Sequence, residues 1–299
     1  MDPFVDFIQL LRPQATLWSR VETSGTWGLS FQPHDDVLFC WVEQGACYLV
    51  RRDSEPLAMG TNDFVLVRAS VPFAFASSDA AMMTDSESTI TGAGVVARLG
   101  TDARVDTVLR GGKFVFDSVN EQLLTGLLPE VTHVAASAEA SERVRALLAM
   151  NEAECSRVGV GSKFVIARLM ELILVEVLRT PNSGCEGWQA GMLAGLRDPV
   201  ISRALMALHG DVARPWTTEM LACHCGTSRS ALAARFARVV GYGPIAYLQQ
   251  WRIAVAKEQL RRGQGTVGEI ALLVGFQSSS AFSTAFKRAV GCSPSEFEQ

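Results

Sequence analysis

The first 130 residues carry their apolar positions in short runs that turn residues separate. Such runs lie at Val37–Val42, Ala46–Arg51, Phe64–Val67 and Phe73–Ala76, and the tripeptide Glu43-Gln44-Gly45 separates the first two. Runs of this length and spacing predict the short β-strands of a sandwich or barrel.

Beyond residue 135 the apolar positions follow the period of a helix. Residues Ala138–Cys155 and Lys163–Arg179 are both predicted to be helical. The second segment carries a wide stripe that is nearly free of charge, formed by Ile166, Leu169, Met170, Ile173, Leu174, Val177 and Leu178. Such a stripe packs on the β-rich domain, pairs with its equivalent in a second subunit, or does both, so residues 163–179 are a candidate homodimer surface.

A linker and helix caps organise the rest of the chain. The segment from Thr180 to Gly184 combines a helix breaker with little apolar content. We therefore expect a domain over 1–180, a linker over 181–190 and a helical domain over 191–299. In the helical domain, Asp198-Pro199 predicts the start of a helix, and Thr266 with Glu269 predicts a capping box.

The helical domain contains one sequence pattern twice. Ser228–Val240 and Ser278–Val290 align at a shift of fifty residues, and each copy then continues into Gly-x-x-Pro. In both copies an apolar helical stretch reaches a glycine, Gly226 or Gly275, turns within two or three residues and restarts at the serine. Two helix-turn-helix units in one small domain indicate double-stranded DNA as the partner.

The second helix of each unit has one apolar side and one side of small, polar or basic residues. Phe236 in the first unit, and Phe282 and Phe286 in the second, are predicted to anchor the helix on the domain. The opposite side can approach a major groove closely and offer hydrogen bonds and charge. The predicted DNA-contacting residues are Arg229, Ser230, Ala233, Ala234, Arg235 and Arg238 of the first unit and Ser279, Ser280, Ser283, Thr284, Lys287 and Arg288 of the second.

A predicted helix over Pro244–Arg262 connects the two units. Pro244 lies in its first turn and Gly263 just beyond its end. At about 1.5 Å per residue this helix spans roughly 28 Å. Successive major grooves on one face of B-DNA lie about 34 Å apart, so two units on this spacer could read adjacent grooves.

Charge is distributed unevenly along the chain. Residues 197–299 hold 12 Lys/Arg against 7 Asp/Glu, a net charge of +5, whereas the remainder is at −9. A basic domain on an acidic body fits a phosphate-binding face. No run of about eighteen apolar residues exists and no basic signal-peptide start is present, so we expect a cytoplasmic protein without a membrane span. The seven cysteines, an odd number, do not indicate a disulfide framework.

A set of residues spread over about a hundred positions carries a family signature. They are Asp198-Pro199, Trp216, Leu221-Ala222, Gly226, Ser228, Arg235-Phe236, Gly241, Pro244, Tyr247-Leu248, Arg252, Ala256, Leu260, Ile270-Ala271, Val274-Gly275-Phe276, Ser278, Ala281-Phe282, Phe286-Lys287-Arg288, Gly291 and Ser293-Pro294. On these residues the domain resembles the AraC/XylS family of bacterial transcription regulators. The family often has a bulky or charged residue where this chain has Ala234, so specificity would lean on the second unit, on the arginines of the first, and on DNA shape.

The N-terminal part shows a second, looser resemblance. Its residues are Met1-Asp2-Pro3, Leu11-Arg12-Pro13, Trp27, Val42-x-x-Gly45-x-Cys47-x-Leu49 and Asp63-x-Val65-Leu66, and they resemble the cupin-type sensor domain of a subset of this family. The resemblance implies a β-barrel that responds to a ligand or a redox signal. The alternative is a cupin-type metal-dependent enzyme with an accessory helical domain. Because Phe73 and Cys40 stand where histidine is common, and only His34 and His133 lie in the first half, we expect no metal, no cofactor and no enzymatic activity.

Cys40 and Cys47 are a candidate redox pair. If Glu43-Gln44 form a two-residue hairpin loop, these cysteines face each other with Cβ atoms roughly 4.5–5.5 Å apart. A disulfide there would store strain and suit a switch, and the alternative is two small buried residues. Cys223-His224-Cys225 looks like a metal motif, but thiols two residues apart on a helix project to different sides, so Cys225 is expected in the core and Cys223 near its edge.

Together these observations predict an α+β multidomain protein. A cupin-like N-terminal β-barrel with a helical segment precedes an all-α domain with two helix-turn-helix units. The expected function is sequence-specific DNA binding by a transcription regulator, controlled by a small-molecule or redox signal and an unknown effector in the N-terminal barrel. Six aromatic residues either line a pocket for an apolar or aromatic effector or are plain core: Trp27, Phe39, Trp41, Tyr48, Phe73 and Phe75.

Overall fold

The computed structural model describes the chain apart from residues 1, 12, 19, 53, 79–80, 92–95, 101, 103, 117–127, 158, 181–190 and 298–299. The chain divides into two compact units. The β-rich unit comprises Pro13–Val115 and Glu130–Trp188, and the helical unit comprises Met1–Arg12, Phe116–Pro129 and Gln189–Gln299. The predicted linker, 181–190, lies outside the described residues.

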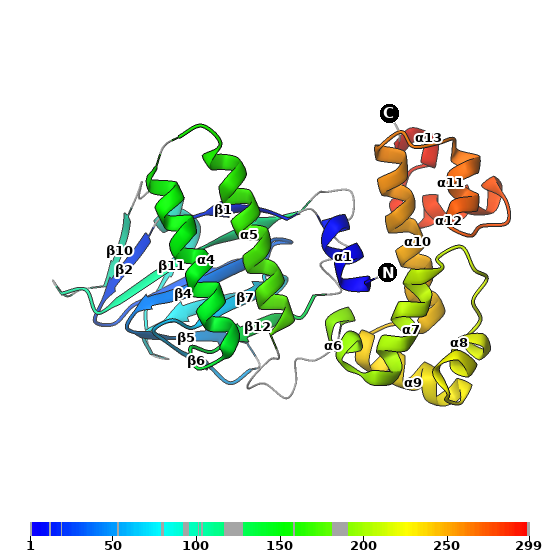
Figure 1. Ribbon diagram of the computed structural model, residues 1–299. Helices are drawn as coiled ribbons and strands as arrows, with labels where there is room; N and C mark the ends of the chain where they lie inside the picture. The colour runs from blue at the N-terminus through cyan, green and yellow to red at the C-terminus, as the bar shows by residue number, and fades with distance from the viewer. Residues whose placement is uncertain are drawn as a thin grey trace. The chain divides into compact units, whose positions relative to one another are not determined.

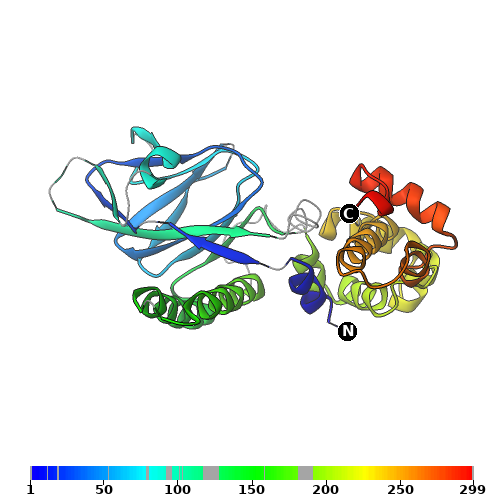
Figure 2. The same cartoon turned by 90° about the horizontal axis from the view of Figure 1, so that it is seen from above.

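The β-rich unit is built from two facing sheets (Figures 1 and 2). The large sheet has the order β10-β2-β11-β4-β7-β12, and β1 also pairs with β11. Its strands are β1 (Gln14–Leu17), β2 (Arg20–Ser24), β4 (Val37–Gln44), β7 (Phe64–Arg68), β10 (Val96–Gly100), β11 (Thr107–Val115) and β12 (Val131–Val134). The small sheet has the order β6-β5-β8-β3-β9, with β3 (Gly28–Phe31), β5 (Ala46–Arg51), β6 (Leu57–Gly60), β8 (Phe73–Ala76) and β9 (Met83–Asp85), and the short helix α2 (Ser86–Thr91) follows β9.

Alternate strand residues point into the space between the two sheets and fill it. The large sheet contributes Val21, Leu38, Cys40, Val42, Val65, Val67 and Leu109, and the small sheet contributes Leu29, Phe31, Cys47, Leu49, Met59, Phe73 and Phe75. The rings of Phe31, Phe73 and Phe75 pack on one another with centroids 4.8–5.9 Å apart. The predicted cupin-like fold class is confirmed, although the described strands form two separate sheets rather than a closed barrel.

The predicted hairpin between β4 and β5 is wrong. Both strands exist where expected, but β4 pairs with β7 and β11 whereas β5 pairs with β6 and β8, so the two belong to different sheets. The chain crosses between the sheets at Gly45, whose φ of +84° is a left-handed conformation. A Cβ atom at Gly45 would overlap the carbonyl oxygen of Asp106, so only glycine fits this crossing.

Helices α4 (Glu139–Ser156) and α5 (Ser162–Arg179) lie side by side on the outer face of the large sheet (Figure 2). The apolar stripe of α5 is buried inside the unit, at Leu169, Met170, Ile173, Leu174, Val177 and Leu178. Of the two roles predicted for this stripe, packing on the β-rich domain is therefore the one observed. The other side of α5 exposes Phe164 (68%) and Leu172 (51%).

The helical unit contains α1 and all helices after the linker. They are α1 (Pro3–Leu11), α6 (Met192–Arg197), α7 (Pro199–Gly210), α8 (Thr218–Cys225), α9 (Arg229–Val240), α10 (Pro244–Arg261), α11 (Val267–Leu273), α12 (Ser279–Val290) and α13 (Pro294–Phe297). The predicted starts are confirmed, because Asp198 caps α7 with Pro199 at its first position and Thr266 with Glu269 forms a capping box on α11. No helix among the described residues is long and apolar enough to cross a membrane.

Candidate nucleic-acid interface

The first helix-turn-helix unit consists of α8 and α9. Thr217 caps α8 by accepting a hydrogen bond from the Met220 N–H at 3.2 Å, and α8 ends at Gly226 in a left-handed conformation. Ser228 then caps α9 by accepting from the Ala231 N–H at 3.3 Å. These caps satisfy backbone groups that a helix end otherwise leaves unpaired, which fixes the turn between the helices. Three buried residues hold α9 on the domain: Leu232, Phe236 and Val240.

The second unit, α11 and α12, repeats this construction. Ser278 caps α12 by accepting from the Ala281 N–H at 3.2 Å, and the buried Phe282 and Phe286 anchor it. The rings of Phe276, Phe282, Phe286 and Phe297 pack in succession with centroids 5.4–5.5 Å apart. Figure 1 shows the two units at opposite ends of α10. At about 1.5 Å per residue, the 18 residues of α10 span roughly 27 Å.

The outward face of α9 carries the predicted DNA-contacting residues, but two of its arginines already have partners. Arg229 forms an ion pair with Glu219 at 2.7 Å, and both side chains are largely exposed. The Nε of Arg235 donates to the Asp198 carboxylate at 2.7 Å, which ties α9 to the start of α7. Ser230, Ala234 and Arg238 are exposed and Ala233 is half-buried.

The pKa of Asp198 reflects this tie. Burial alone would raise it, but the hydrogen bonds from Arg235 and from the backbone N–H groups of Ile201 and Val200 hold the pKa of the carboxyl below its ordinary value. Asp198 thus caps α7 and holds Arg235 at the same time. A structural role for Arg235 is a feature that the sequence did not reveal, because its partner lies 37 positions away.

The outward face of α12 carries more polar side chains, although the Ser280 hydroxyl is paired with that of Ser278 and the Thr284 hydroxyl donates to the Ser280 carbonyl. Ser279, Ser280, Thr284, Lys287 and Arg288 are exposed and Ser283 is half-buried. An open hollow of about 400 Å³ follows this face and is lined by Ser280, Ala281, Thr284, Ala285 and Arg288. Within the described parts of the chain, no carboxylate pairs with Arg288. The face therefore combines small residues, hydroxyl groups and a cation on one capped helix.

Arg252 joins the two helix-turn-helix units, a role that its position in the sequence did not predict. It lies on α10, is 5% exposed, and donates to the backbone carbonyls of Val212, Ala213 and Arg214 at 2.9, 3.4 and 2.8 Å. Its guanidinium also lies 5.9 Å from the ring of Phe276, in the turn of the second unit. One signal was available in the sequence, since Arg252 stands within an apolar run of α10.

Helix α1 packs on this domain through a buried polar group. Asp6 of α1 lies 3.3 Å from Nδ1 of His209 on α7, and Nε2 of His209 lies 2.7 Å from the hydroxyl of Tyr247 on α10. Trp251 packs on the imidazole with ring centroids 4.2 Å apart. Burial lowers the pKa of His209, and the Asp6 carboxylate opposes that shift only in part. A neutral imidazole that donates to Asp6 and accepts from Tyr247 satisfies all three groups.

The described cysteines and histidines of the β-rich unit do not assemble a metal site. Among the described residues, no three His, Cys, Asp or Glu side chains group closely enough to hold a metal ion. Cys40 and Cys47 are both buried free thiols. Burial, followed by the Asp63 carboxylate, raises the pKa of Cys47 to about 12, and burial raises that of Cys40 well above its ordinary value. In the helical unit, Cys225 is buried and Cys223 exposed, as predicted.

The six candidate effector-binding aromatics do not line one pocket. Trp27, Phe73 and Phe75 belong to the core between the sheets. Phe39 stacks with Trp41 and Phe64, on the opposite side of the large sheet, with centroids 6.4 and 6.1 Å apart. Tyr48 is 40% exposed. The structure therefore supports the interpretation of Trp27, Phe73 and Phe75 as plain core.

Comparison with known proteins places this architecture. Residues 2–181 match the family described as Cupin, and residues 221–299 match the family described as Helix-turn-helix domain. The whole chain is 36% identical, over 301 residues, to a protein of Streptomyces antibioticus described as an AraC-like transcription regulator, of which the match covers 99%. The chain belongs to the AraC-like transcription regulators.

This AraC-like regulator has further relatives of the same kind. It is 29% identical to the HTH-type transcriptional regulator AlkR of Acinetobacter baylyi, with 93% of each chain covered. The crystal structure of ToxT from Vibrio cholerae matches 96% of this chain and 97% of its own, at 15% identity and a TM-score of 0.37. On its two domain matches and its curated relatives, the regulator is a DNA-binding transcription regulator with a cupin-type N-terminal domain and a helix-turn-helix domain.

Proposed function

We propose that this AraC-like regulator reads two successive major grooves of double-stranded DNA with α9 and α12. The observation that carries the proposal is the repetition of one capped, Phe-anchored helix at both ends of α10. The roughly 27 Å rise of α10 approaches the ~34 Å repeat of the groove. Arg252 supports this arrangement because it bonds to the first half and packs on the second.

The two readers differ in what they offer. On α12, Ser279, Ser280, Ser283, Thr284, Lys287 and Arg288 supply hydrogen bonds and charge to bases and phosphates. On α9, Ala233 and Ala234 permit close approach while Ser230, Arg229 and Arg238 provide polar contacts. Arg235 contributes chiefly by holding α9 on Asp198. Base readout therefore rests mainly on α12.

Control by a small molecule is assigned to the β-rich unit. The interior between its sheets is filled by side chains, so an effector inside the barrel would have to displace core residues. Redox control through Cys40 and Cys47 is less favoured, because thiols with raised pKa values form little of the reactive thiolate at neutral pH. The protein is proposed to act without catalysis, in the cytoplasm where a bacterial chromosome lies.

The exposed side of α5 is the proposed homodimer surface. Phe164 and Leu172 lie eight residues apart and so share one face of the helix. Leu172→Glu should shift a dimer towards monomer in sedimentation velocity, whereas Lys163→Glu, at the start of the same helix, should not. A wild-type monomer at all concentrations would contradict the proposal.

The DNA-binding proposal is tested by fluorescence anisotropy with random duplex DNA at several salt concentrations. Arg288→Ala and Lys287→Ala should each weaken binding and lower the salt slope by about 0.9 for each phosphate that the variant no longer neutralises. Arg168→Ala, an exposed arginine on α5, is the matched control and should change neither quantity. A slope unchanged in both α12 variants would contradict the assignment of α12 as a DNA reader.

A further inference from the structure

A cleft of about 140 Å³ lies between α4 and the outer face of the large sheet. It is separate from the core between the sheets. Its lining comes from β4, the turn before β7, β7 itself and four turns of α4, and includes Trp41, Asn62, Phe64, Leu148 and Arg145. A cavity of roughly this size can hold a single benzene ring.

The inner part of the cleft is apolar and well ordered by its neighbours. Phe64 and Val144 are buried, and Leu148 closes the same side from α4. Trp41 is held by stacking on Phe39, at 6.4 Å and 8° between planes. An aromatic floor with aliphatic walls favours a flat apolar group over a hydrated ion.

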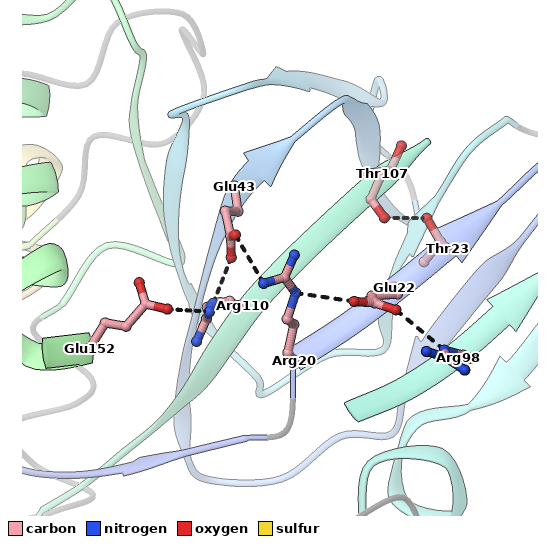
Figure 3. A network of polar contacts seen from close by, with 8 residues as sticks. All are labelled: Arg20, Glu22, Thr23, Glu43, Arg98, Thr107, Arg110 and Glu152. Carbon is pink, nitrogen blue, oxygen red and sulfur yellow. Dashed lines mark hydrogen bonds and ion pairs between the residues drawn. The ribbon is translucent and has the colours of Figure 1, made fainter. Parts of the chain in front are cut away.

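Carboxylates on one side of the cleft are already neutralised. Figure 3 shows a ladder of alternating charges across the outer face of the sheet, formed by Arg98, Glu22, Arg20, Glu43, Arg110 and Glu152. Glu43 and Glu152 line the cleft, but Arg110 bridges them and Arg20 adds a second contact to Glu43 at 3.2 Å. This side therefore presents little net charge to a ligand.

Arg145 is the charged lining residue that this ladder does not include. It lies on the exposed side of α4, at the mouth of the cleft. Among the residues that the structure describes, no carboxylate forms an ion pair with it. Asn62, whose φ is +72°, adds an amide to the same lining. The cleft thus combines a ring-sized apolar floor with one cation and one amide.

We propose that this cleft binds a compact monocarboxylate carrying a single aromatic or alicyclic ring, with the ring on Trp41 and Phe64 and the carboxylate on Arg145. The inference rests on the proposed function, in which the β-rich unit senses a small molecule, and names the class of that molecule. Arginine and a carboxylate form charge-assisted hydrogen bonds, which are roughly twice as strong as neutral ones.

The position of the cleft suits a regulatory site. One wall of the cleft is α4, which packs along α5 and is tied to it by the ion pair of Arg143 with Glu176 at 2.8 Å. From the end of α5 at Arg179 the chain continues to the DNA-binding domain. A ligand that fixes α4 on the sheet would favour one setting of this helix pair.

The test is calorimetric titration of the full-length protein with phenylacetate and with phenethylamine, which share a ring and a chain length but differ in charge. Phenylacetate should bind saturably, and phenethylamine at least about tenfold more weakly. Arg145→Gln should weaken phenylacetate by about tenfold, as expected for one charge-assisted hydrogen bond. Ala149→Phe, which fills the cleft, should abolish binding.

Two controls on the same helix separate site effects from changes in folding. Glu142→Gln and Ala146→Phe alter exposed residues of α4 that do not line the cleft, and both should bind phenylacetate like the wild type. Equal binding of amine and acid, equal effects of Ala149→Phe and Ala146→Phe, or no binding of phenylacetate would each overturn the proposal. DNA binding measured by anisotropy in the same samples would remain in those cases, so the failure would concern the cleft alone.

Discussion

Arg252 shows how much one side chain can organise. A guanidinium inside a protein is stable only if its N–H groups find acceptors, and here three backbone carbonyls of the segment after α7 provide them. Burial lowers the pKa of Arg252, with the Asp211 charge opposing that shift, yet a guanidinium stays charged at any ordinary pH. Gly275 lets the backbone of the second unit approach the same guanidinium closely.

Replacing Arg252 should therefore destabilise both helix-turn-helix units. Arg252→Met keeps much of the apolar stem but leaves the carbonyls without donors, and should lower the free energy of unfolding by about 2–3 kcal/mol. Arg252→Lys should recover only part of the lost free energy of unfolding, because one ammonium group cannot reproduce the forked N–H donors of a guanidinium. Urea unfolding measures both, and full recovery by lysine would show that charge alone suffices.

His209 makes the helical unit sensitive to pH. Its pKa in the folded state is lowered by burial, so below the ordinary value near 6.5 the unfolded chain binds the proton more readily than the folded one. The stability that the neutral imidazole contributes is thus complete above that value and is lost as the pH falls below it. Between pH 7 and pH 5, wild-type stability in urea should fall more steeply than that of His209→Gln. Equal falls in stability for the wild type and the variant would show that His209 is not the source of the pH dependence.

Periodicity predicted the outward residues of α9 and α12 because a helix fixes each side chain by its position in the turn. The same reasoning could not find the partners of Arg235 or His209. Asp198 and Asp6 lie 37 and 203 positions away from them, and nothing local marks these pairs.

At the scale of secondary-structure elements, local sequence signals predicted the helix starts correctly. They did not predict where the chain crosses from one sheet to the other. Caps at Asp198, Thr266 and Ser278 were predictable because donor and acceptor lie within three residues. The crossing of the chain from β4 to the small sheet was not predictable, because Gly45 must fit against Asp106, which is distant in sequence. The hairpin pairing of Cys40 with Cys47 failed for this reason, although both thiols belong to the core between the sheets and Cys47 acts electrostatically on Cys40.

Gly45→Ala should consequently destabilise the β-rich unit more than the same change at a glycine with open space around it. Gly161, with φ of +88° and open space around a Cβ, is the matched control and should cost only about 1–2 kcal/mol for the left-handed backbone. At Gly45 the overlap with backbone adds about 1–3 kcal/mol more. Calorimetric midpoints of the two variants give the difference, and equal midpoints would show that the crossing relaxes easily.

At the scale of the whole molecule, the chain's first helix belongs to the same compact unit as its last. Phe7 and Leu11 of α1 are fully buried, and α1 contacts α7 and α10. The sequence assigned this segment to the N-terminal domain because its residues resemble those of the cupin-type sensor domain. No local pattern indicates its packing with residues two hundred positions away.

Phe7→Ala should accordingly weaken the DNA-binding domain. A Phe→Ala change in a core costs about 3–5 kcal/mol, and the loss should appear as faster hydrogen exchange in α7 and α10. Val5→Ala, an exposed position on the same helix, should leave exchange unchanged. Faster exchange in the strands of the β-rich unit, with α7 and α10 unaffected, would place α1 in the other unit.

Because α10 is a rigid helix that Arg252 holds at its middle, it restricts the spacing of the DNA sites that this regulator can bind. If α9 and α12 read two half-sites as proposed, each base pair inserted between these half-sites would turn one of them by about a tenth of a helical turn relative to the other. A protein that cannot twist to follow would release one of the two half-sites within two or three insertions. Its promoters should therefore accept point substitutions in the half-sites more readily than changes in the number of base pairs between them.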